Sequence, residues 1–518
     1  MSSVTTGWPR LGAIPRGDGL VDFRVWAPAA GSVTVRVDGR DHELRSAADG
    51  IFEAALAARA GSEYLYVLDG ERLLPDPCSR AQPHGVRGPS LIVDTAAFRW
   101  SDAGWRGLAL DGLVIYELHV GAFSGAGTFD GVIERLGDLR ELGVSAIELM
   151  PVATFPGERN WGYDGVYAYA PHPVYGGPEG LARLVDAAHR EGLGVILDVV
   201  YNHIGPGSEA IAAFAPYFTD RHTTFWGDAI DYRERGAREW AIQNAELWVR
   251  DYHVDGLRLD ATHAIYDDTH PHVLAELAER VRAINPRVLV TSEMEPGNLR
   301  PIDEWGHDAQ WADEFHHVLH VLLTDERDGY YGDYRPSVTD LARQLERTPP
   351  QKLVFCSQNH DQVGNRALGD RPKLDELRLR AAALLLAPQT PLLFMGEEYG
   401  EQRPFQFFTD HIDPAIADAT RKGRKREFEK FSAFSGEDVP DPQDPATFER
   451  SKLHPDEGDP DLLAFYKRLL ALRRETPAEA VSVDADEEER TLRVRRGNVE
   501  LKLDFSEHPA GYTLTPYV

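Results

Sequence analysis

Eight short apolar segments recur between residues 113 and 396, and segments with the periodicity of amphipathic helices separate many of them. This alternation constrains the fold most, because parallel strands buried on both faces appear as almost continuous apolar runs. Two of the helical segments, Pro178–Gly192 and His272–Ile284, place their apolar residues on one face. Eight strands with intervening helices predict an α/β fold, the TIM (β/α)8 barrel. The expected strands are Leu113–His119, Ala146–Pro151, Leu193–Val200, Gly256–Asp260, Arg287–Ser292, Ala309–Trp311, Lys352–Gln358 and Pro391–Gly396.

The 518 residues exceed what a barrel alone requires, and the flanking segments differ from it. Before the barrel, short runs rich in β-branched and aromatic residues predict an N-terminal β-sandwich over residues 1–98. The catalytic barrel is expected at 99–435, and a connector, a helix and a small C-terminal β domain at 436–518. The supporting segments are Asp22–Ala27, Val33–Val37 and Tyr64–Leu68 for the sandwich, and the loop Phe434–Gly458, the helix Leu462–Arg474 and the strands Arg490–Arg495 and Val499–Asp504 for the C-terminal part.

The formal net charge of −29 argues against nucleic acid and anionic membranes as partners, because both bind basic surfaces. Neither a signal peptide nor an apolar run long enough to cross a bilayer is apparent. The two cysteines, Cys78 and Cys356, form no disulfide framework and have no metal-ligand spacing. We therefore expect a cytoplasmic protein.

Polar residues gather at the ends of four predicted strands, within Asp198–His203, Gly256–His263, Ser292–Glu295 and Gln358–Arg366. Active sites of TIM barrels lie at the carboxyl ends of the strands. One carboxylate at such a position is more often a helix cap or part of an ion pair. Four such segments at strand ends are much harder to explain by stability alone, so they predict an active site.

The carboxylates suit glycoside hydrolysis with retention of configuration. Arg258 and Asp260 are two residues apart on one strand, so they share a face, and Arg258 favours the ionised form that a nucleophile requires. Glu293 on the next strand is the expected general acid/base, because retaining enzymes pair two carboxyl groups about 5–5.5 Å apart. Asp361 supplies a third carboxylate for the positive charge that develops on the sugar.

Sugar recognition is assigned to residues near the same strand ends. His203, His263 and His360 are expected to bind hydroxyl groups, and Tyr163 is the candidate for stacking on the reacting sugar. A zinc site formed by these histidines is a weaker alternative, since no pair of possible ligands has the i, i+4 spacing of a helix. The spacing of Asp198 and Asn202 says little about calcium. The proposed chemistry requires neither a metal nor another cofactor.

These segments resemble the four signature regions of the α-amylase superfamily of glycoside hydrolases, in the order Asp198–His203, Gly256–His263, Ser292–Glu295 and Asn359–Asp361. The N-terminal part is similar to the glycan-binding sandwich of branching and debranching enzymes. Within the superfamily, longer stretches most resemble the maltooligosyltrehalose trehalohydrolases. These stretches are Tyr116–Gly121, Asn160–Gly177, Asp313–His317, Gln358–Arg366 and Pro404–His411.

The resemblance implies hydrolysis of the α-1,4 bond next to the terminal trehalose of maltooligosyltrehalose. It also implies a pathway link to a maltooligosyltrehalose synthase, with physical association left open. It assigns Asp198 as a buried partner of Arg258. The third region departs from the usual sequence of the family, which leaves Glu295 as an alternative to Glu293 for the role of proton donor. The implied substrate contacts are Tyr163, His203, Arg258, His263, Asp313, Phe315, His316, His317, His360, Gln362, Asn365 and Arg366.

Two alternatives stay open. A branching, debranching or α-amylase-type enzyme would keep the same three carboxylates and differ in its acceptor and in the glucan ends that fit. A non-catalytic glycan-binding protein on a degenerate barrel would belong to a different class, and such proteins usually lose one of the three.

Overall fold

Eight parallel strands close into a barrel in the computed structural model of the chain, in the order β10-β11-β14-β17-β18-β19-β20-β21. The structure describes residues 7–224, 226–428, 439–476 and 481–516. Every predicted barrel strand coincides with one of these strands to within about two residues, which confirms the fold class. The strands are β10 Ile115–Leu118, β11 Ala146–Leu149, β14 Gly194–Val199, β17 Gly256–Leu259, β18 Leu289–Ser292, β19 Ala309–Trp311, β20 Leu353–Cys356 and β21 Thr390–Phe394.

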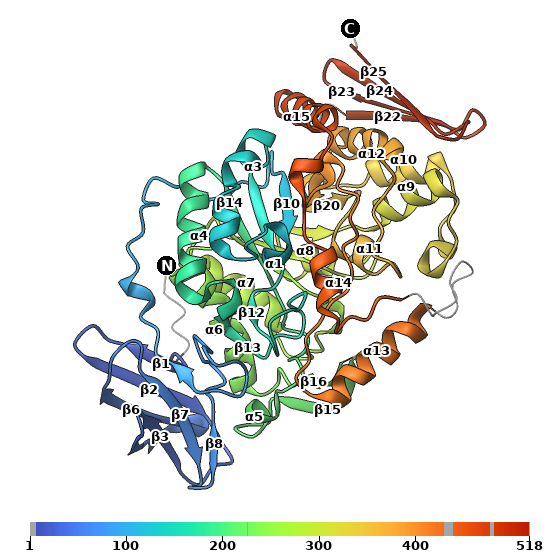
Figure 1. Cartoon of the computed structure of the whole chain (residues 1–518). Helices are drawn as coiled ribbons and strands as arrows, with labels where there is room; N and C mark the ends of the chain where they lie inside the picture. Colours follow the sequence, from blue (N-terminus) through green and yellow to red (C-terminus); the bar gives the residue numbers. More distant parts are fainter. Residues whose placement is uncertain (1–6, 225, 429–438, 477–480, 517–518) are drawn as a thin grey trace.

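Helices surround the barrel and extend its loops (Figure 1). Helix α4, Gly177–Glu191, shows why the sequence fixes their ends: Pro178 stands in the first turn, and Gly192 ends the helix at φ +79°, a conformation that glycine adopts without strain. No helix in the described parts of the chain is long and apolar enough to cross a membrane. The other helices up to α13 are α1 Val120–Phe123, α2 Phe129–Ile133, α3 Leu136–Leu142, α5 Glu209–Ala212, α6 Arg235–Asp251, α7 Val273–Ile284, α8 Arg300–Asp303, α9 Glu314–Thr324, α10 Val338–Leu345, α11 His360–Gly364, α12 Leu374–Leu386 and α13 Pro414–Phe428.

The barrel interior changes from apolar to polar toward the carboxyl ends of its strands. Residues two apart on a strand share a face, and on four of the strands an apolar interior residue is followed by a polar one. The buried lower layer contains Ile115, Ala146, Ile196 and Leu289, which pack in one cluster. Two residues further along the same strands stand Glu117, Glu148, Asp198 and Thr291, all buried. The polar layer supports the side chains at the strand ends.

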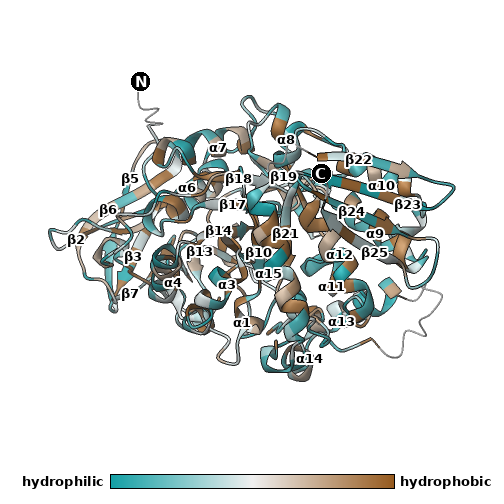
Figure 2. Ribbon diagram, turned by 90° about the horizontal axis from the view of Figure 1, so that it is seen from above, coloured by the Kyte–Doolittle hydropathy of each residue, from teal (hydrophilic) through white to brown (hydrophobic). Residues whose placement is uncertain are grey.

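Two small sheets form the N-terminal part and confirm the predicted sandwich. They lie at one end of the molecule, and the C-terminal sheet lies at the other end with the barrel between them (Figure 2). The first sheet has the order β1-β2-β6-β5 and the second β4-β3-β7-β8, with β9 paired to β7. The strands are β1 Gly12–Pro15, β2 Leu20–Trp26, β3 Val33–Val37, β4 Arg40–Glu43, β5 Arg45–Ser46, β6 Ile51–Ala57, β7 Glu63–Leu68, β8 Arg72–Leu74 and β9 Ser90–Leu91.

Two short antiparallel pairs lie in the barrel loops, and neither was predicted. They are β12 Ala153–Thr154 with β13 Tyr167–Pro171, and β15 Phe218–Thr224 with β16 Gly227–Ile230. The second pair carries polar residues at most positions, so it lacks the apolar alternation that signals a strand.

The C-terminal part consists of helix α15, Pro460–Glu475, and an antiparallel sheet. The expected loop 434–458 is wrong in one respect, because it contains helix α14, Pro445–Arg450. Asp444 caps α14 by accepting from Ala446 N, and Pro445 occupies its first turn. Residues 434–438 and the proposed boundary at 435/436 lie outside the described residues, and both domain boundaries stay predictions. The sheet comprises β22 Val481–Asp486, β23 Thr491–Arg496, β24 Val499–Asp504 and β25 Gly511–Pro516.

Candidate active site

The guanidinium of Arg258 joins the carboxylates of three successive barrel strands. Its Nη1 donates to Asp198 Oδ2 at 2.7 Å and to Asp260 Oδ1 at 2.8 Å, and its Nη2 donates to Glu293 Oε2 at 2.8 Å. Arg258 is fully buried, and its guanidinium carbon lies 4.1 Å from the ring centroid of Trp311. One cation therefore fixes both proposed catalytic carboxylates against a rigid wall.

Donors hold both carboxylate oxygens of Asp260. Arg258 contacts Oδ1, and Asn202 Nδ2 donates to Oδ2 at 2.7 Å. Charge-assisted hydrogen bonds favour the ionised carboxylate and fix its orientation. This environment suits a nucleophile, and it also explains Asn202, whose side chain supports Asp260.

Glu293 is tied to the backbone that follows the proposed nucleophile. Ala261 N donates to Glu293 Oε2 at 2.9 Å, while Ala261 itself adopts the left-handed conformation at φ +40°. This conformation is unfavourable for alanine, so the surrounding contacts must enforce it. Both donors contact Oε2, and Oε1 is left as the oxygen that can carry the catalytic proton. Glu295 is exposed and has no such contacts, so the geometry favours Glu293 as the donor.

A hydrogen-bonded chain runs from Glu117 through His360 and Tyr163 to Asp198. The carboxylate of Glu117 accepts from His360 N at 2.9 Å and from His360 Nδ1 at 2.6 Å. Tyr163 OH donates to Asp198 Oδ2 at 2.7 Å and lies 2.7 Å from His360 Nε2, so it accepts from that nitrogen. Both ring nitrogens of His360 therefore carry protons. Although burial opposes the charge, Asp361 and Glu117 raise the pKa of His360 to about 10.

Asp361 completes the set of three carboxylates. Its Oδ2 lies 3.4 Å from His360 Nε2, and Asn365 Nδ2 donates to its Oδ1 at 2.9 Å. Burial, together with the charges of Glu293 and Asp361, raises the pKa of Asp313 to about 8. A carboxyl group that stays protonated at neutral pH can donate a hydrogen bond, which an ionised carboxylate cannot do.

The polar layer below the site contains a second glutamate beside Glu117. Glu148 is its register partner on the adjacent strand, is buried, and has no hydrogen-bond partner for either carboxyl oxygen. Burial and the charge of Glu117 raise the pKa of Glu148 well above its ordinary value. Glu148 is therefore the neutral member of this pair, whereas Glu117 accepts two hydrogen bonds from His360. Sequence reasoning missed both, although each is a carboxylate inside an otherwise apolar strand.

The predicted sugar contacts around His203 and Tyr163 are brought together. His203 Nε2 donates to the Tyr163 carbonyl oxygen at 2.8 Å, and its Nδ1 contacts Asn202 Oδ1. Trp226 stacks on the His203 ring at 4.2 Å and exposes 46% of its surface. An exposed aromatic face beside the carboxylates could bind a sugar ring, and the sequence pattern did not indicate it. His263 is exposed just past the end of β17.

Other predicted contacts lie on helices α9 and α11, which follow strands β19 and β20. Phe315 is buried in the core against Phe355, and His316 is buried between Ser357 O and Tyr331 OH. Phe315 therefore contributes packing, whereas His316 also lines a cavity beside the barrel. His317 packs among tyrosine rings, and Gln362 accepts from Tyr330 OH at 3.0 Å.

Arg366 forms ion pairs with Glu326 and Asp370 in a separate cavity. In the loop after β21, the rings of Phe405 and Phe408 are buried, so they contribute packing there.

Arg258 supplies the cation that Asp198, Asp260 and Glu293 share. Over the described ranges, no group of three or more His, Cys, Asp or Glu side chains is arranged to hold a metal ion. Both cysteines are free and buried.

Comparison with known proteins matches two family models. The model described as the α-amylase catalytic domain matches residues 99–226, and the model of carbohydrate-binding module 48, the isoamylase N-terminal domain, matches residues 10–79. The chain is 46% identical over 503 residues to the malto-oligosyltrehalose trehalohydrolase of Deinococcus radiodurans, covering 90% of this chain and 83% of the relative. It is 41% identical to the enzyme of the same name from Saccharolobus solfataricus, covering 88% of this chain and 85% of the relative.

Among solved structures, a protein from Salmonella typhimurium described as an α-amylase superposes with a TM-score of 0.87. It is 38% identical in sequence, and the match covers 96% of this chain and 93% of the other. The likeness therefore includes the N-terminal and C-terminal sheets as well as the barrel.

Proposed function

The chain belongs to the malto-oligosyltrehalose trehalohydrolase family, and we propose that it hydrolyses the α-1,4-glucosidic bond next to the terminal trehalose of maltooligosyltrehalose. It is a glycoside hydrolase on the α-amylase scaffold, with the retaining mechanism general for that family. The substrate is inferred from relatives that share this name over most of the chain. The products are trehalose and a maltooligosaccharide.

The observation that carries the proposal is the bridge that Arg258 forms between Asp260 and Glu293. In the first step, a carboxylate oxygen of Asp260 attacks the anomeric carbon of the glucose before the trehalose unit. Glu293 gives its proton to the glycosidic oxygen, and trehalose leaves. Asp361 and the charged His360 lie beside the reacting sugar, where Asp361 stabilises the positive charge of the transition state.

The second step releases the maltooligosaccharide. Glu293, now ionised, takes a proton from water, and the oxygen attacks the anomeric carbon bonded to Asp260. Two inversions at this carbon return the α configuration. The donors to Asp260 from Arg258 and Asn202 favour its departure as a carboxylate.

The exposed aromatic rings near the carboxylates support binding of a glucan. Trp226 stacks on His203, and the partly exposed Tyr163 stacks on His360 with 5.1 Å between ring centroids. An exposed ring suits the apolar face of a glucose unit. The proposal includes a pathway link to a maltooligosyltrehalose synthase, since such an enzyme would supply the substrate. A cytoplasmic location stays a prediction from the sequence.

Product analysis tests the proposal and separates it from its nearest rival. The protein is incubated separately with maltotriosyl trehalose and with maltopentaose. We expect trehalose plus maltotriose from the first and slow turnover of the second. Rapid attack on maltopentaose, or longer and branched products from an α-glucan, would instead indicate an amylase or a branching enzyme.

The Asp260→Asn variant tests the different class, a non-catalytic glycan-binding protein. Asparagine keeps the shape of the side chain and its contact with Asn202 but removes the nucleophilic charge. Loss of turnover with maltooligosaccharide binding retained would support the enzyme. Binding without any Asp260-dependent turnover in the wild type would support the binding protein.

A further inference from the structure

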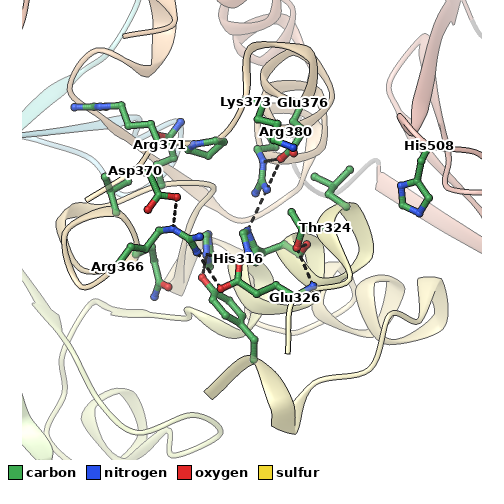
Figure 3. A pocket seen from close by; sticks show the side chains of 17 residues that line it. His316, Thr324, Glu326, Arg366, Asp370, Arg371, Lys373, Glu376, Arg380 and His508 are labelled. Atoms are coloured by element: carbon green, nitrogen blue, oxygen red, sulfur yellow. Dashed lines mark hydrogen bonds and ion pairs between the residues drawn. The ribbon is translucent and has the colours of Figure 1, made fainter. Parts of the chain in front are cut away.

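A cavity of about 430 Å³ lies beside the barrel, between α9, α11 and α12 (Figure 3). Its wall includes the end of α9, the segment after α11 and the start of α12, and His508 from the C-terminal part borders its far side. The volume lies in the range of about 300–1,000 Å³ that small-molecule sites occupy. The cavity is separate from the Arg258 cluster, none of whose members lines it.

The carboxylates of this cavity are already neutralised. Arg380 donates to Glu376 Oε2 at 2.8 Å and to His320 Nδ1 at 3.2 Å, so that His320 Nε2 carries the proton and donates to Glu326 at 2.8 Å. Burial and the nearby Arg380 lower the pKa of His320 to about 2, which keeps its ring neutral. The same chain continues from Glu326 through Arg366 to Asp370.

Two cations in the wall have no carboxylate partner. Arg371 is buried and donates only to the carbonyl oxygens of Arg403 and Met395, at 3.0 and 2.9 Å. Its Nη2 has no acceptor. Lys373 is exposed at the mouth and forms no ion pair within the described parts of the chain. A buried cation is costly, and the carboxylate of Glu401 acts on Arg371 through space without a hydrogen bond or ion pair among the described residues.

Further donors converge on the same space. Arg380 Nη1 and the side-chain amide of Gln358 are buried in the wall without hydrogen-bond partners. Lys373 is also the residue that precedes α12, and as a cation it offers no acceptor to the amides of the first turn. The positive end of this helix, 13 residues long, is therefore uncapped by a side chain at the mouth.

We propose that this cavity binds a small hydroxylated anion, with a phosphate group near Arg371 and Lys373 and sugar hydroxyl groups along the ion-paired wall. Phosphate is the anion that best matches a guanidinium, an ammonium and a helix N-terminus together. Glu326, Asp370 and Glu376 retain oxygen lone pairs that accept from hydroxyl groups. Arg366 was predicted to contact the glucan substrate, but it lines this cavity, and the proposed site gives it a role.

Titration calorimetry with the full chain tests the proposal, using glucose 6-phosphate, inorganic phosphate and glucose as separate ligands. We expect binding of glucose 6-phosphate, weaker binding of inorganic phosphate, and none of glucose at this site. Lys373→Ala should weaken the binding of glucose 6-phosphate at least about tenfold, because it removes a charge-assisted contact. Lys373 is exposed, so this variant should fold normally, which its melting temperature checks.

Lys422→Ala is the matched control, because Lys422 is an exposed lysine of α13 that pairs with Asp418 and does not line the cavity. It should leave the affinity unchanged. Equal affinity for the two phosphates would show that the phosphate group alone is recognised, with free phosphate as the ligand. The proposal is overturned if neither phosphate binds at millimolar concentration, or if Lys373→Ala binds glucose 6-phosphate as the wild type does.

Discussion

Replacing Glu117 by glutamine tests how the buried polar layer controls the site above it. Glutamine presents one oxygen and one NH2 group, whereas Glu117 accepts from both His360 N and His360 Nδ1. The oxygen of the glutamine can keep the bond from the backbone N–H. Its NH2 group then requires an unprotonated Nδ1 as an acceptor, so the variant favours neutral His360.

The size of the effect follows from the bond that is lost. A hydrogen bond to a charged group contributes about 1.5–3 kcal/mol, and one pKa unit corresponds to about 1.4 kcal/mol. The pKa of His360 should therefore fall by about 1–2 units from its value of about 10. A histidine whose pKa is raised by folding adds stability that is complete below about pH 6.5 and is lost as the pH rises through the folded pKa. The variant should thus be less stable than the wild type at neutral pH, with the difference vanishing above pH 10.

Nitrogen NMR of ¹⁵N-histidine-labelled protein measures this pKa directly, with the His360 signals assigned from a His360→Gln sample. Glu148→Gln is the matched control, because Glu148 is the neighbour of Glu117 across the strands and is already neutral. Its substitution should leave the titration of His360 in place. An unchanged titration in Glu117→Gln, or an equal shift in both variants, would refute the reasoning.

Substitutions at three further positions probe the carboxylate cluster. Arg258→Met should lower kcat by a factor of at least about 10²–10³. It should also lower the free energy of unfolding in urea by about 3–5 kcal/mol, because it leaves Asp198 buried without its cation. A variant that turns over substrate as fast as the wild type would contradict this. Asp313→Asn should have a higher melting temperature than the wild type, by an amount that grows from pH 4 to pH 8. The raised pKa of Asp313 makes the contribution of this residue to the stability of the wild type fall over that interval. A difference in melting temperature that does not change with pH would contradict this. Asn365→Asp should lower kcat about 10- to 100-fold by placing a like charge beside Asp361, and Asn365→Ala, which adds no charge, should lower it less.

The barrel could be predicted because its strands are buried on both faces. Even the three-residue strand β19, Ala309–Trp311, was found from its position in the alternation. Helix α13, Pro414–Phe428, was missed because it is largely exposed and its apolar residues do not form a continuous stripe. The hairpin of β15 and β16 was missed for a related reason, and with it Trp226.

The predicted site separates into residues at strand ends and residues on the following helices. Strand direction fixes the former, so Asp260, Glu293 and Asp361 meet around Arg258 and His360 as their spacing suggests. Successive residues of a helix point about 100° apart, so a run such as Phe315–His317 cannot face the substrate at every position.

Glu117 and Glu148, in contrast, belong to the site but were not predicted. The two strands that carry them are otherwise apolar, and only the closed barrel reveals that both side chains belong to the polar layer.

The anomeric configuration of the new reducing end tests the proposed mechanism most directly. Proton NMR follows the first minutes of maltotriosyl trehalose hydrolysis, before the released maltotriose mutarotates. We predict that the α anomer appears first, together with trehalose, and that Asp260→Asn releases neither product. Initial release of the β anomer, or sustained turnover by Asp260→Asn, would contradict a retaining mechanism with Asp260 as nucleophile.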